Sequence, residues 1–521
     1  MKKLNASTSS FEKLITNNNL YVDKTEFIWN LIQNEETYFM ARPRRFGKSL
    51  TVSTLEAIFQ GKRELFKGLA IYDKEYDWTS YPIIRLDLGK GAYTSLEKTS
   101  SALCNIVERN ASSHAIKLKH DSPNEMFQDL IIALKEKHNK KVVILVDEYD
   151  KPIVDTLGKP FAKDVLELLK PFYTVIKSYD ADERFVFITG VSKFSHVSLF
   201  SGLNNPTDIS MWSEYATMLG YTQNELESVF AEHIEAAAQK LNMPREDLLK
   251  RLKEWYDGFC FEADSETVYN PFSIAKFFES AKPKFSNYWF DTATPTFLID
   301  YCKNNQFDLE SALTDAVPSS KFSAYEIDNI NPLALFLQTG YLTIKDAYEE
   351  FGFTYYHLGF PNKEVLSSFE EKLLDAYTEM QEGLASKFSV DIVRMLRKGE
   401  VEAAMQLLKS FYAGFPFKIQ ERSEHYYQAI FFAIFRSLGF SAFAESPTSD
   451  GSIDAVVEID NWVYIFEFKL DVSAEEAMRQ IKEKDYYRKY LMTGKQIVLI
   501  GANFVYKTRQ LDKWIIEEIR R

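Results

Sequence analysis

Four short apolar runs, separated by stretches with helical spacing, organise the first 190 residues of the chain. The runs span residues 38–41, 83–88, 141–146 and 184–189, and apolar residues recur at helical intervals over 50–59, 96–109 and 125–138. Apolar runs without an alternating polar face are typical of parallel strands that are buried on both faces, with helices as their connections. The pattern predicts an α/β fold built on a parallel sheet.

Length and composition favour several packed domains. The chain has 521 residues, of which 45% are hydrophobic and 15% aromatic. At about 100–200 residues per domain, this length predicts three or so units, and no segment has the biased composition of a disordered chain. The formal net charge of −13 argues against binding of nucleic acid over the whole surface. Any nucleic-acid contact is therefore expected to be local.

The amino terminus and the cysteines indicate in which cellular compartment the protein is expected. No apolar run follows Lys2 and Lys3, so we expect no secretory signal. No window approaches the ~18 uncharged apolar residues of a membrane span. Cys104, Cys260 and Cys302 are widely spaced and lack a zinc-ligand pattern, so each is expected to be a reduced, mostly buried thiol. These features predict a cytoplasmic protein without membrane contact.

Polar residues follow three of the predicted strands. They are Lys48 and Ser49, then Asp147 and Glu148, then residues 189–192. Ligands of parallel sheets bind at the carboxyl ends of strands, and a phosphate–Mg²⁺ site needs helix-terminal amides, a lysine, a hydroxyl and a nearby acid. We expect Ser49 and Asp147 to hold Mg²⁺, Lys48 to bind the phosphates of ATP, and Glu148 to activate water.

Arg42 stands where the usual phosphate-loop pattern has its first glycine. A glycine at that position would allow a positive φ angle, which other residues adopt reluctantly. Arg42, Arg44 and Arg45 are instead expected to add positive charge around the phosphates. Two alternatives stay open: Gly-Lys-Ser opens many ordinary helices, and Glu148 could act only as a charge in a sensing domain without hydrolysis.

Several segments together resemble a known group. "YVDKTEFIWNLI", "RPRRFGKSL", "VVILVDEYDKPI" and "FVFITGVSKFS" are similar to the AAA-ATPase-like family of bacterial proteins that carry a carboxyl-terminal PD-(D/E)XK nuclease-like domain. The resemblance covers nearly the whole chain and implies a P-loop ATPase architecture for its first part. Its loop motif marks as nucleotide-binding candidates Arg42, Arg44, Arg45, Phe46, Gly47, Lys48, Ser49 and Leu50.

The middle of the chain is predicted to be mainly helical. Thr222 and Glu225 have capping-box spacing, and helical segments continue to about residue 341. Small helical subdomains that follow a P-loop core often act as lids, which is our expectation here. The cluster of Trp255, Tyr256 and Phe259 could stack bases but is more often core. The runs "TGYLTIKD" and "FGFTYYHLGF" predict two strands without assigned chemistry.

A predicted hairpin near the carboxyl end brings charged residues together. Residues 453–459 and 462–470 are separated by Asp460 and Asn461, a pair suited to a tight two-residue turn. In that register Asp454 faces Glu467, and Lys469 points to the same side. The opposite face collects apolar residues and is the expected core face. Two opposed acids destabilise a sheet unless a cation lies between them, and Mg²⁺ suits oxygen ligands.

This arrangement resembles the PD-(D/E)XK phosphodiesterase core, since "GSID" matches G-x-x-D and "FEFK" matches E-x-K. The resemblance implies Mg²⁺ ligation by Asp454 and Glu467, with Lys469 acting on the attacking water. It also implies a further metal ligand from the preceding helix, Glu424 or, failing that, Glu421. On the later helix it implies Gln480 and Tyr487 near the site. The competing interpretations are a surface salt bridge of Lys469 and a solvated helix face.

We therefore predict a P-loop NTPase sheet with a helical lid, followed by an α/β restriction-endonuclease-like domain. The expected domains are 1–210 (ATPase-like), 211–345 (lid), 346–395 (linker and small mixed element) and 396–521 (nuclease-like). The expected function is ATP binding and hydrolysis coupled to Mg²⁺-dependent cleavage of DNA or RNA. Two alternatives are a non-enzymatic nucleotide-dependent switch or nucleic-acid-binding scaffold, and an ATPase with a degenerate hairpin.

Overall fold

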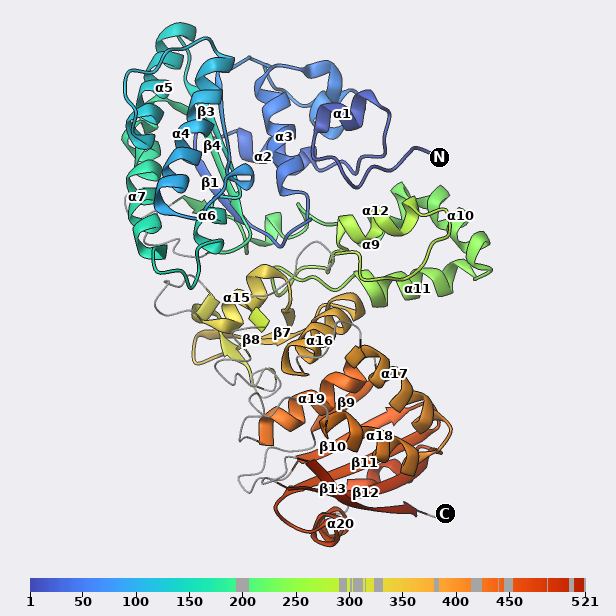
Figure 1. Ribbon diagram of the computed structural model, residues 1–521. Coiled ribbons are helices and arrows are strands. Elements are labelled where there is room, and N and C mark those ends of the chain that lie inside the picture. The colour runs from blue at the N-terminus through green and yellow to red at the C-terminus, as the bar shows by residue number, and fades with distance from the viewer. Residues whose placement is uncertain are drawn as a thin grey trace. The chain divides into compact units, whose positions relative to one another are not determined.

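The computed structural model describes residues 1–193, 206–289, 298–299, 302, 313, 315–322, 331–378, 384–413, 424–438, 440–444, 453–484, 486–505 and 510–519 (Figure 1). The chain divides into two compact units. The first comprises Met1–Thr292 with Ala316–Asn362, and the second comprises Ala293–Asp315 with Lys363–Arg521. The four domains expected from the sequence are finer than these two units, and their boundaries stay predictions.

A five-stranded parallel sheet forms the centre of the first unit, as the apolar runs predict. Its strand order is β2-β3-β4-β1-β5. The strands are β1 (Thr37–Ala41), β2 (Ile83–Asp87), β3 (Val142–Asp147), β4 (Glu183–Gly190) and the short β5 (Thr207–Asp208). Every residue of β3 is buried, so the middle of the sheet is covered on both faces. The α/β fold class is confirmed.

Helices cover both faces of this sheet. Figure 1 shows α4, α5 and α7 on one side of the strands and α1 to α3 on the other. The helices are α1 (Phe11–Thr16), α2 (Thr25–Ile32), α3 (Lys48–Phe59), α4 (Leu96–Ser113), α5 (Pro123–His138), α6 (Lys151–Val154) and α7 (Ala162–Ser178). Because α3 follows β1 directly, the β1–α3 turn lies at the carboxyl edge of the sheet.

A helical group follows the sheet, as predicted. It contains α9 (Gln223–Val229), α10 (Ala231–Leu241), α11 (Arg245–Tyr256) and α12 (Pro271–Glu279). The Thr222 hydroxyl accepts from Glu225 N, and the Glu225 carboxylate accepts from Thr222 N, so the predicted capping box is present. Tyr256 is fully buried in the core of this group and Phe259 is 1% exposed. Both rings are therefore core residues.

The remainder of the first unit contains a small antiparallel sheet. The predicted strand pair is present as β7 (Thr343–Glu350) and β8 (Phe353–Gly359), and β6 (Val317–Pro318) pairs with β8. One helix, α15 (Pro332–Thr339), precedes β7, and Asn331 caps its first turn. Asn331 accepts from two backbone amides there, which satisfies donors that have no partner inside the helix.

A second five-stranded sheet forms the second unit, in the order β13-β12-β11-β10-β9. Its strands are β9 (Ser441–Ala444), β10 (Ile453–Ile459), β11 (Trp462–Leu470), β12 (Gln496–Val505) and β13 (Gln510–Ile519). Only β11 and β12 run parallel. The helices are α16 (Lys363–Thr378), α17 (Leu384–Arg397), α18 (Val401–Ala413), α19 (Glu424–Arg436) and α20 (Ala474–Glu483), followed by the 3-10 turn η8 (Tyr486–Tyr490).

Core residues cover both faces of the second sheet, whereas the sequence interpretation placed core on one face only. On the expected face, the Phe431 ring of α19 lies 4.9 Å from the rings of Phe466 and Phe468. The other face carries a second cluster, in which α20 packs on β11 and β12. Val456 and Ile465 belong to that cluster and share their face with Glu467. The acidic face is therefore apolar along much of its length.

Candidate functional site

The turn between β1 and α3 has the geometry of an anion-binding loop. Arg45 has φ 66° and Gly47 has φ 100°, so two residues adopt left-handed conformations before the helix begins at Lys48. The Gly47 position favours glycine because of this φ angle. The first amides of α3 point toward the turn without partners inside the helix, and the helix dipole adds positive potential there. This end of α3 therefore suits a phosphate group.

Lys48 lies inside the turn. Its Nζ donates hydrogen bonds to the carbonyls of Arg42 and Pro43, both at 2.8 Å. Burial lowers the pKa of Lys48 to about 8, and the charges of Glu148 and Asp147 act in the opposite direction. The ammonium is thus held by the loop's own carbonyls, which a phosphate could replace as partners.

Asp147 ends β3 beside the turn. It is 2% exposed, accepts a hydrogen bond from the Ser49 hydroxyl, and its Oδ1 has no partner within the described residues. Burial raises the pKa of Asp147. A buried carboxylate oxygen without a partner is costly unless a ligand or water satisfies it. Ser49 and Asp147 therefore form an oxygen donor pair of the kind that Mg²⁺ prefers.

Glu148 adopts a constrained conformation next to Asp147. Its φ of 56° is uncommon for a residue with a side chain, and such strain often occurs at functional positions. Its carboxylate packs against Gly89, where an added Cβ would lie 2.5 Å from Glu148 Oε2. Burial raises the pKa of Glu148, with Lys48 as the main opposing charge. The position and the raised pKa suit a general base.

The β1–α3 loop and Glu148 line a hollow of about 480 Å³. The loop contributes Arg44 to Thr51, with Arg45 exposed and Leu50 half-buried, and Glu148 lies opposite. The sequence interpretation missed two further walls, residues 4–9 and 218–221. Their sequences carry no phosphate-binding signal, since only tertiary packing brings them to the site. The start of α12, Pro271 and Phe272, closes another side.

Arg42 points away from this hollow, which corrects the expectation that its charge surrounds the phosphates. The side chain is 1% exposed, and its guanidinium donates to the carbonyls of Ala41, Ser210 and Tyr215 at 3.0, 2.5 and 3.1 Å. It also lies 4.2 Å from the Phe261 ring centre. Arg42 therefore anchors the loop to the strand β5 region.

Phe46 also faces the protein interior. Its ring packs edge-on against Phe259 and Phe261, at 4.8 and 5.4 Å between ring centres. Trp289 supports the loop as well, because its Nε1 donates to the Arg44 carbonyl at 2.8 Å. Phe46 can meet a nucleotide only through its backbone, and its side chain fixes the loop.

Asp150 organises the neighbouring strand end and was not singled out from the sequence. Its carboxylate accepts from Val191 N, Ser192 N and the Ser192 hydroxyl, at 2.8–3.2 Å. This contact ties the turn after β3 to the end of β4. The only sequence signal for it is a third acid in "DEYD".

The predicted charged hairpin is present in the second unit. β10 and β11 pair with Asp454 opposite Glu467, as the two-residue turn predicts. Glu467 is 0% exposed, and neither carboxylate oxygen accepts a hydrogen bond within the described residues. Lys469 Nζ forms an ion pair with Glu467 Oε1 at 3.1 Å. A buried carboxylate with one ion-pair partner and no hydrogen bond has unused capacity for a cation.

The structure describes the other predicted residues of this site to different extents. The side chains of Asp454 and Glu424 lie outside the described residues, although β10 carries Asp454 and α19 begins at Glu424. Glu421 lies outside them altogether. Gln480 is half-buried on α20, which covers the Glu467 side of the sheet. Within the described part of the chain, no three potential metal ligands come together.

Tyr487 and Gly501 define how the end of the chain packs near Glu467. Tyr487 is partly buried against the apolar cluster under α20, so the structure gives it a packing role. Gly501 pairs with Glu467 across β11 and β12. A Cβ at Gly501 would approach Met478 N to 2.6 Å and Ala474 O to 2.8 Å, so the backbone of α20 touches the sheet here.

Two family descriptions match the chain. "Predicted AAA-ATPase" matches residues 5–200 and "PD-(D/E)XK nuclease superfamily" matches residues 422–514. A relative from Azotobacter chroococcum mcd 1, "Uncharacterized protein in vnfD 5′region", is 34% identical over 528 residues and matches over 99% of both chains. The chain belongs to the AAA-ATPase-like family. The matched ranges of this AAA-ATPase-like protein contain the β1–α3 loop with Asp147 and Glu148, and the β10–β11 hairpin.

The resemblance inferred from the sequence motifs is thereby confirmed at the level of the two domains. Nothing in the relative's name states an activity, so the reaction of this AAA-ATPase-like protein does not follow from it. Among the described residues, every helix is too short or too polar to cross a bilayer.

Proposed function

We propose that this AAA-ATPase-like protein binds and hydrolyses ATP in its first unit and cleaves DNA or RNA phosphodiester bonds in its second. The observation that carries the nuclease half is the buried Glu467, which has unused carboxylate oxygens, pairs with Asp454 in the sheet and contacts Lys469. A structural ion pair does not need such burial, because exposed pairs contribute little and buried ones cost desolvation.

For ATP, Lys48 would exchange the carbonyls of Arg42 and Pro43 for phosphate oxygens, and the amides at the start of α3 would bind the same group. Ser49 and Asp147 fit a Mg²⁺ ion, since one oxygen of Asp147 lacks a partner. Glu148 would orient and deprotonate water. Its raised pKa strengthens it as a base once it is ionised.

For nucleic acid, Glu467 and Asp454 would hold Mg²⁺, with Glu424 as the proposed third ligand. When bound, Mg²⁺ polarises the scissile phosphate and lowers the pKa of a coordinated water. Lys469 would position that water and offset negative charge in the transition state. Gln480, on the helix over the same face, would orient the water or the phosphate.

We also propose that nucleotide binding controls cutting, because both sites occur on one chain. The helical residues 211–345 would act as the lid over the nucleotide, with 1–210 as the ATPase core, 346–395 as linker and 396–521 as nuclease domain. The three cysteines are free thiols in the structure, which suits the cytoplasmic location we propose.

The test uses purified full-length protein with plasmid, linear and single-stranded DNA and with RNA, each with Mg²⁺ or EDTA and with or without ATP. Lys469→Ala and Asp454→Ala should abolish cleavage while retaining binding of the polymer. Cleavage that persists in both variants would overturn the nuclease assignment. If the wild type binds but never cuts, the protein is a scaffold.

ATP hydrolysis is tested in the same preparations with Lys48→Ala. Lys67→Ala is the matched control, because Lys67 is an exposed lysine away from the loop. Loss of ATP turnover in the first variant alone supports the ATPase assignment. If Lys48→Ala stops ATP turnover and leaves cutting unchanged in the presence of ATP, the coupling is wrong.

A further inference from the structure

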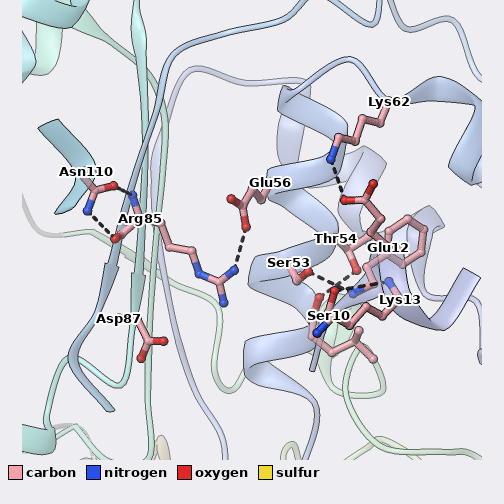
Figure 2. Close-up of polar contacts among 12 residues, drawn as sticks. Ser10, Glu12, Lys13, Ser53, Thr54, Glu56, Lys62, Arg85, Asp87 and Asn110 are labelled. Carbon is pink, nitrogen blue, oxygen red and sulfur yellow. Dashed lines mark hydrogen bonds and ion pairs between the residues drawn. The ribbon is translucent and has the colours of Figure 1, made fainter. Parts of the chain in front are cut away.

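A second hollow lies in the first unit, apart from the loop residues 42–49. It has a volume of about 450 Å³ and is bounded by α3, the end of β2, α4 and residues 9–12 (Figure 2). This volume falls within the range of small-molecule sites. Its walls are polar apart from Ala57 and Ile106. Of its lining residues, Ser9 also lines the hollow at the proposed ATP site.

Arg85 is held in position on one wall of this hollow. β2 is an edge strand, and the Asn110 side chain bonds both backbone groups of Arg85: Arg85 N donates to Asn110 Oδ1 and Asn110 Nδ2 donates to Arg85 O, each at 2.9 Å. The guanidinium then reaches toward α3, where its Nη1 donates to Glu56 Oε2 at 2.7 Å (Figure 2). No other acceptor for this guanidinium occurs among the described residues.

The acids that line the hollow are already neutralised by basic residues of the same walls. The three ion pairs are Glu56–Arg85 and Glu12–Lys62, both at 2.7 Å, and Asp87–Lys90 at 2.8 Å. This pairing leaves Arg109 as a cation without a partner in the part of the chain that the structure describes.

Three exposed side chains at the rim of the hollow carry donors, namely the guanidinium of Arg109, which only donates, and the Gln60 amide and Ser9 hydroxyl, which can also accept. The described residues provide no side-chain acceptor for Arg109, the Gln60 amide or the Ser9 hydroxyl. Guanidinium groups donate only, and charge-assisted bonds to phosphate or carboxylate oxygens are the strongest that they form. A complementary ligand is therefore rich in acceptors and negatively charged.

We propose that this hollow is a second ligand site, which takes a small anion bearing phosphate or carboxylate groups and acts as an effector of the nucleotide site. Arg109 and the free edge of Arg85 bind the anionic group, and Gln60 and Ser9 donate to its remaining oxygens. The effector role rests on the proposed nucleotide site. The helix α3 carries both Lys48 and Glu56, and Ser9 lines both hollows. A ligand in the second hollow would therefore contact α3 and the segment of Ser9, which also form walls of the hollow at the proposed nucleotide site.

Binding is tested by calorimetric titration of full-length Lys48→Ala protein, in which the competing anion site of the loop is weakened. Inorganic pyrophosphate and citrate are the probes, and they separate phosphate from carboxylate ligands. At least one should bind, and adding Arg109→Ala should weaken that binding tenfold or more. Arg63→Ala is the matched control, since Arg63 is exposed and lies over Tyr72, outside the hollow.

If neither probe binds, or if Arg109→Ala and Arg63→Ala weaken the binding equally, no such site exists. Arg109→Gln keeps a polar chain and provides a second variant should the alanine variant fold poorly. The effector role is tested separately in protein with Lys48 intact. Because the probe also competes with ADP at the loop in both proteins, the effector role predicts a change in the Kd of ADP that differs between the wild type and Arg109→Ala. An equal change in both proteins overturns the effector role alone and leaves the binding site standing.

Discussion

The two candidate centres each combine a lysine with buried carboxylates, but they distribute the charges differently. In the first unit, the Lys48 ammonium binds two backbone carbonyls, while Asp147 and Glu148 stand on a separate strand end. In the second, Lys469 pairs directly with Glu467, and both belong to one strand. The first lysine is thus available to an incoming anion, whereas the second is engaged with the acid that would hold a metal.

This difference indicates how each centre responds to its ligand. Under the proposed function, phosphate at the β1–α3 loop would replace neutral carbonyl partners of a buried ammonium, so anion binding would relieve a desolvation cost. A cation at Glu467 competes with Lys469 and would release that lysine toward the substrate. The proposed nuclease mechanism therefore predicts that metal binding and substrate activation are linked in the second centre.

The largest expected effect tests the second centre. Glu467→Gln keeps the side-chain shape but removes the charge that attracts the metal, so cleavage should fall on the order of 10³-fold. The thermal stabilisation that Mg²⁺ gives to the wild type should disappear in this variant. Glu458→Gln is the control, because Glu458 lies on the same hairpin and pairs with Lys495. Unchanged cleavage in Glu467→Gln would remove the metal role.

Substitution of Arg42 tests whether this arginine stabilises the loop or binds the phosphates. Arg42→Ala removes the guanidinium donors of the Ser210 and Tyr215 carbonyls, of which Tyr215 O still accepts from Met218 N, and the free energy of unfolding should fall by about 2–3 kcal/mol. Denaturant titration measures this loss. At low temperature, where the variant remains folded, the Kd of ATP should change less than threefold. A large loss of affinity without a loss of stability would place the Arg42 charge at the phosphates after all.

The lowered pKa of Lys48 predicts that ATP binding depends on pH. The free protein holds Lys48 with a pKa of about 8, and phosphate favours the charged amine, so ATP binding above pH 8 takes up a proton. Affinity should then fall by up to about tenfold per pH unit between pH 8 and 10. Lys48→Arg keeps the charge and should give a flatter curve. An identical slope in both proteins would contradict the assignment.

The smallest expected effect concerns the proposed lid. The Arg45 guanidinium lies 4.9 Å from the ring centre of Phe272, at the start of α12, so this contact joins the loop to the helical group. Phe272→Ala removes a cation–π contact of about 0.5–1 kcal/mol, and ATP should bind about threefold more weakly. Phe285→Ala, which removes a similar contact with Arg251 away from the loop, serves as control. Equal effects would argue against a lid that acts through Arg45.

Local patterns predicted much of the fold. Continuous apolar runs gave the parallel strands, the Asp460-Asn461 turn gave the register of Asp454 with Glu467, and Thr222 with Glu225 gave a capping box. Each of these signals lies within a few residues of the structure that it specifies. The apolar residues on the acidic face, such as Val456 and Ile465, were visible in the sequence, yet the face was interpreted by its acids alone.

Local patterns could not predict which distant residues the long side chains contact. Two of the three carbonyls that bind the Arg42 guanidinium belong to residues about 170 positions later, and no local pattern encodes that pairing. The same holds for the amino-terminal segment that lines the nucleotide hollow and for Asn110, which completes the edge of β2. The site residues proposed for catalysis remain predictions, and the experiments above address them.

The direct backbone contact at Gly501 has a consequence for how far this nuclease-like domain can vary. Any side chain at position 501 would lift α20 from the strand beside Glu467 and carry Gln480 with it. Because the atoms in the way belong to the backbone of Ala474 and Met478, smaller side chains on α20 would not relieve the clash, and glycine at position 501 sets the distance between this helix and the strand next to Glu467.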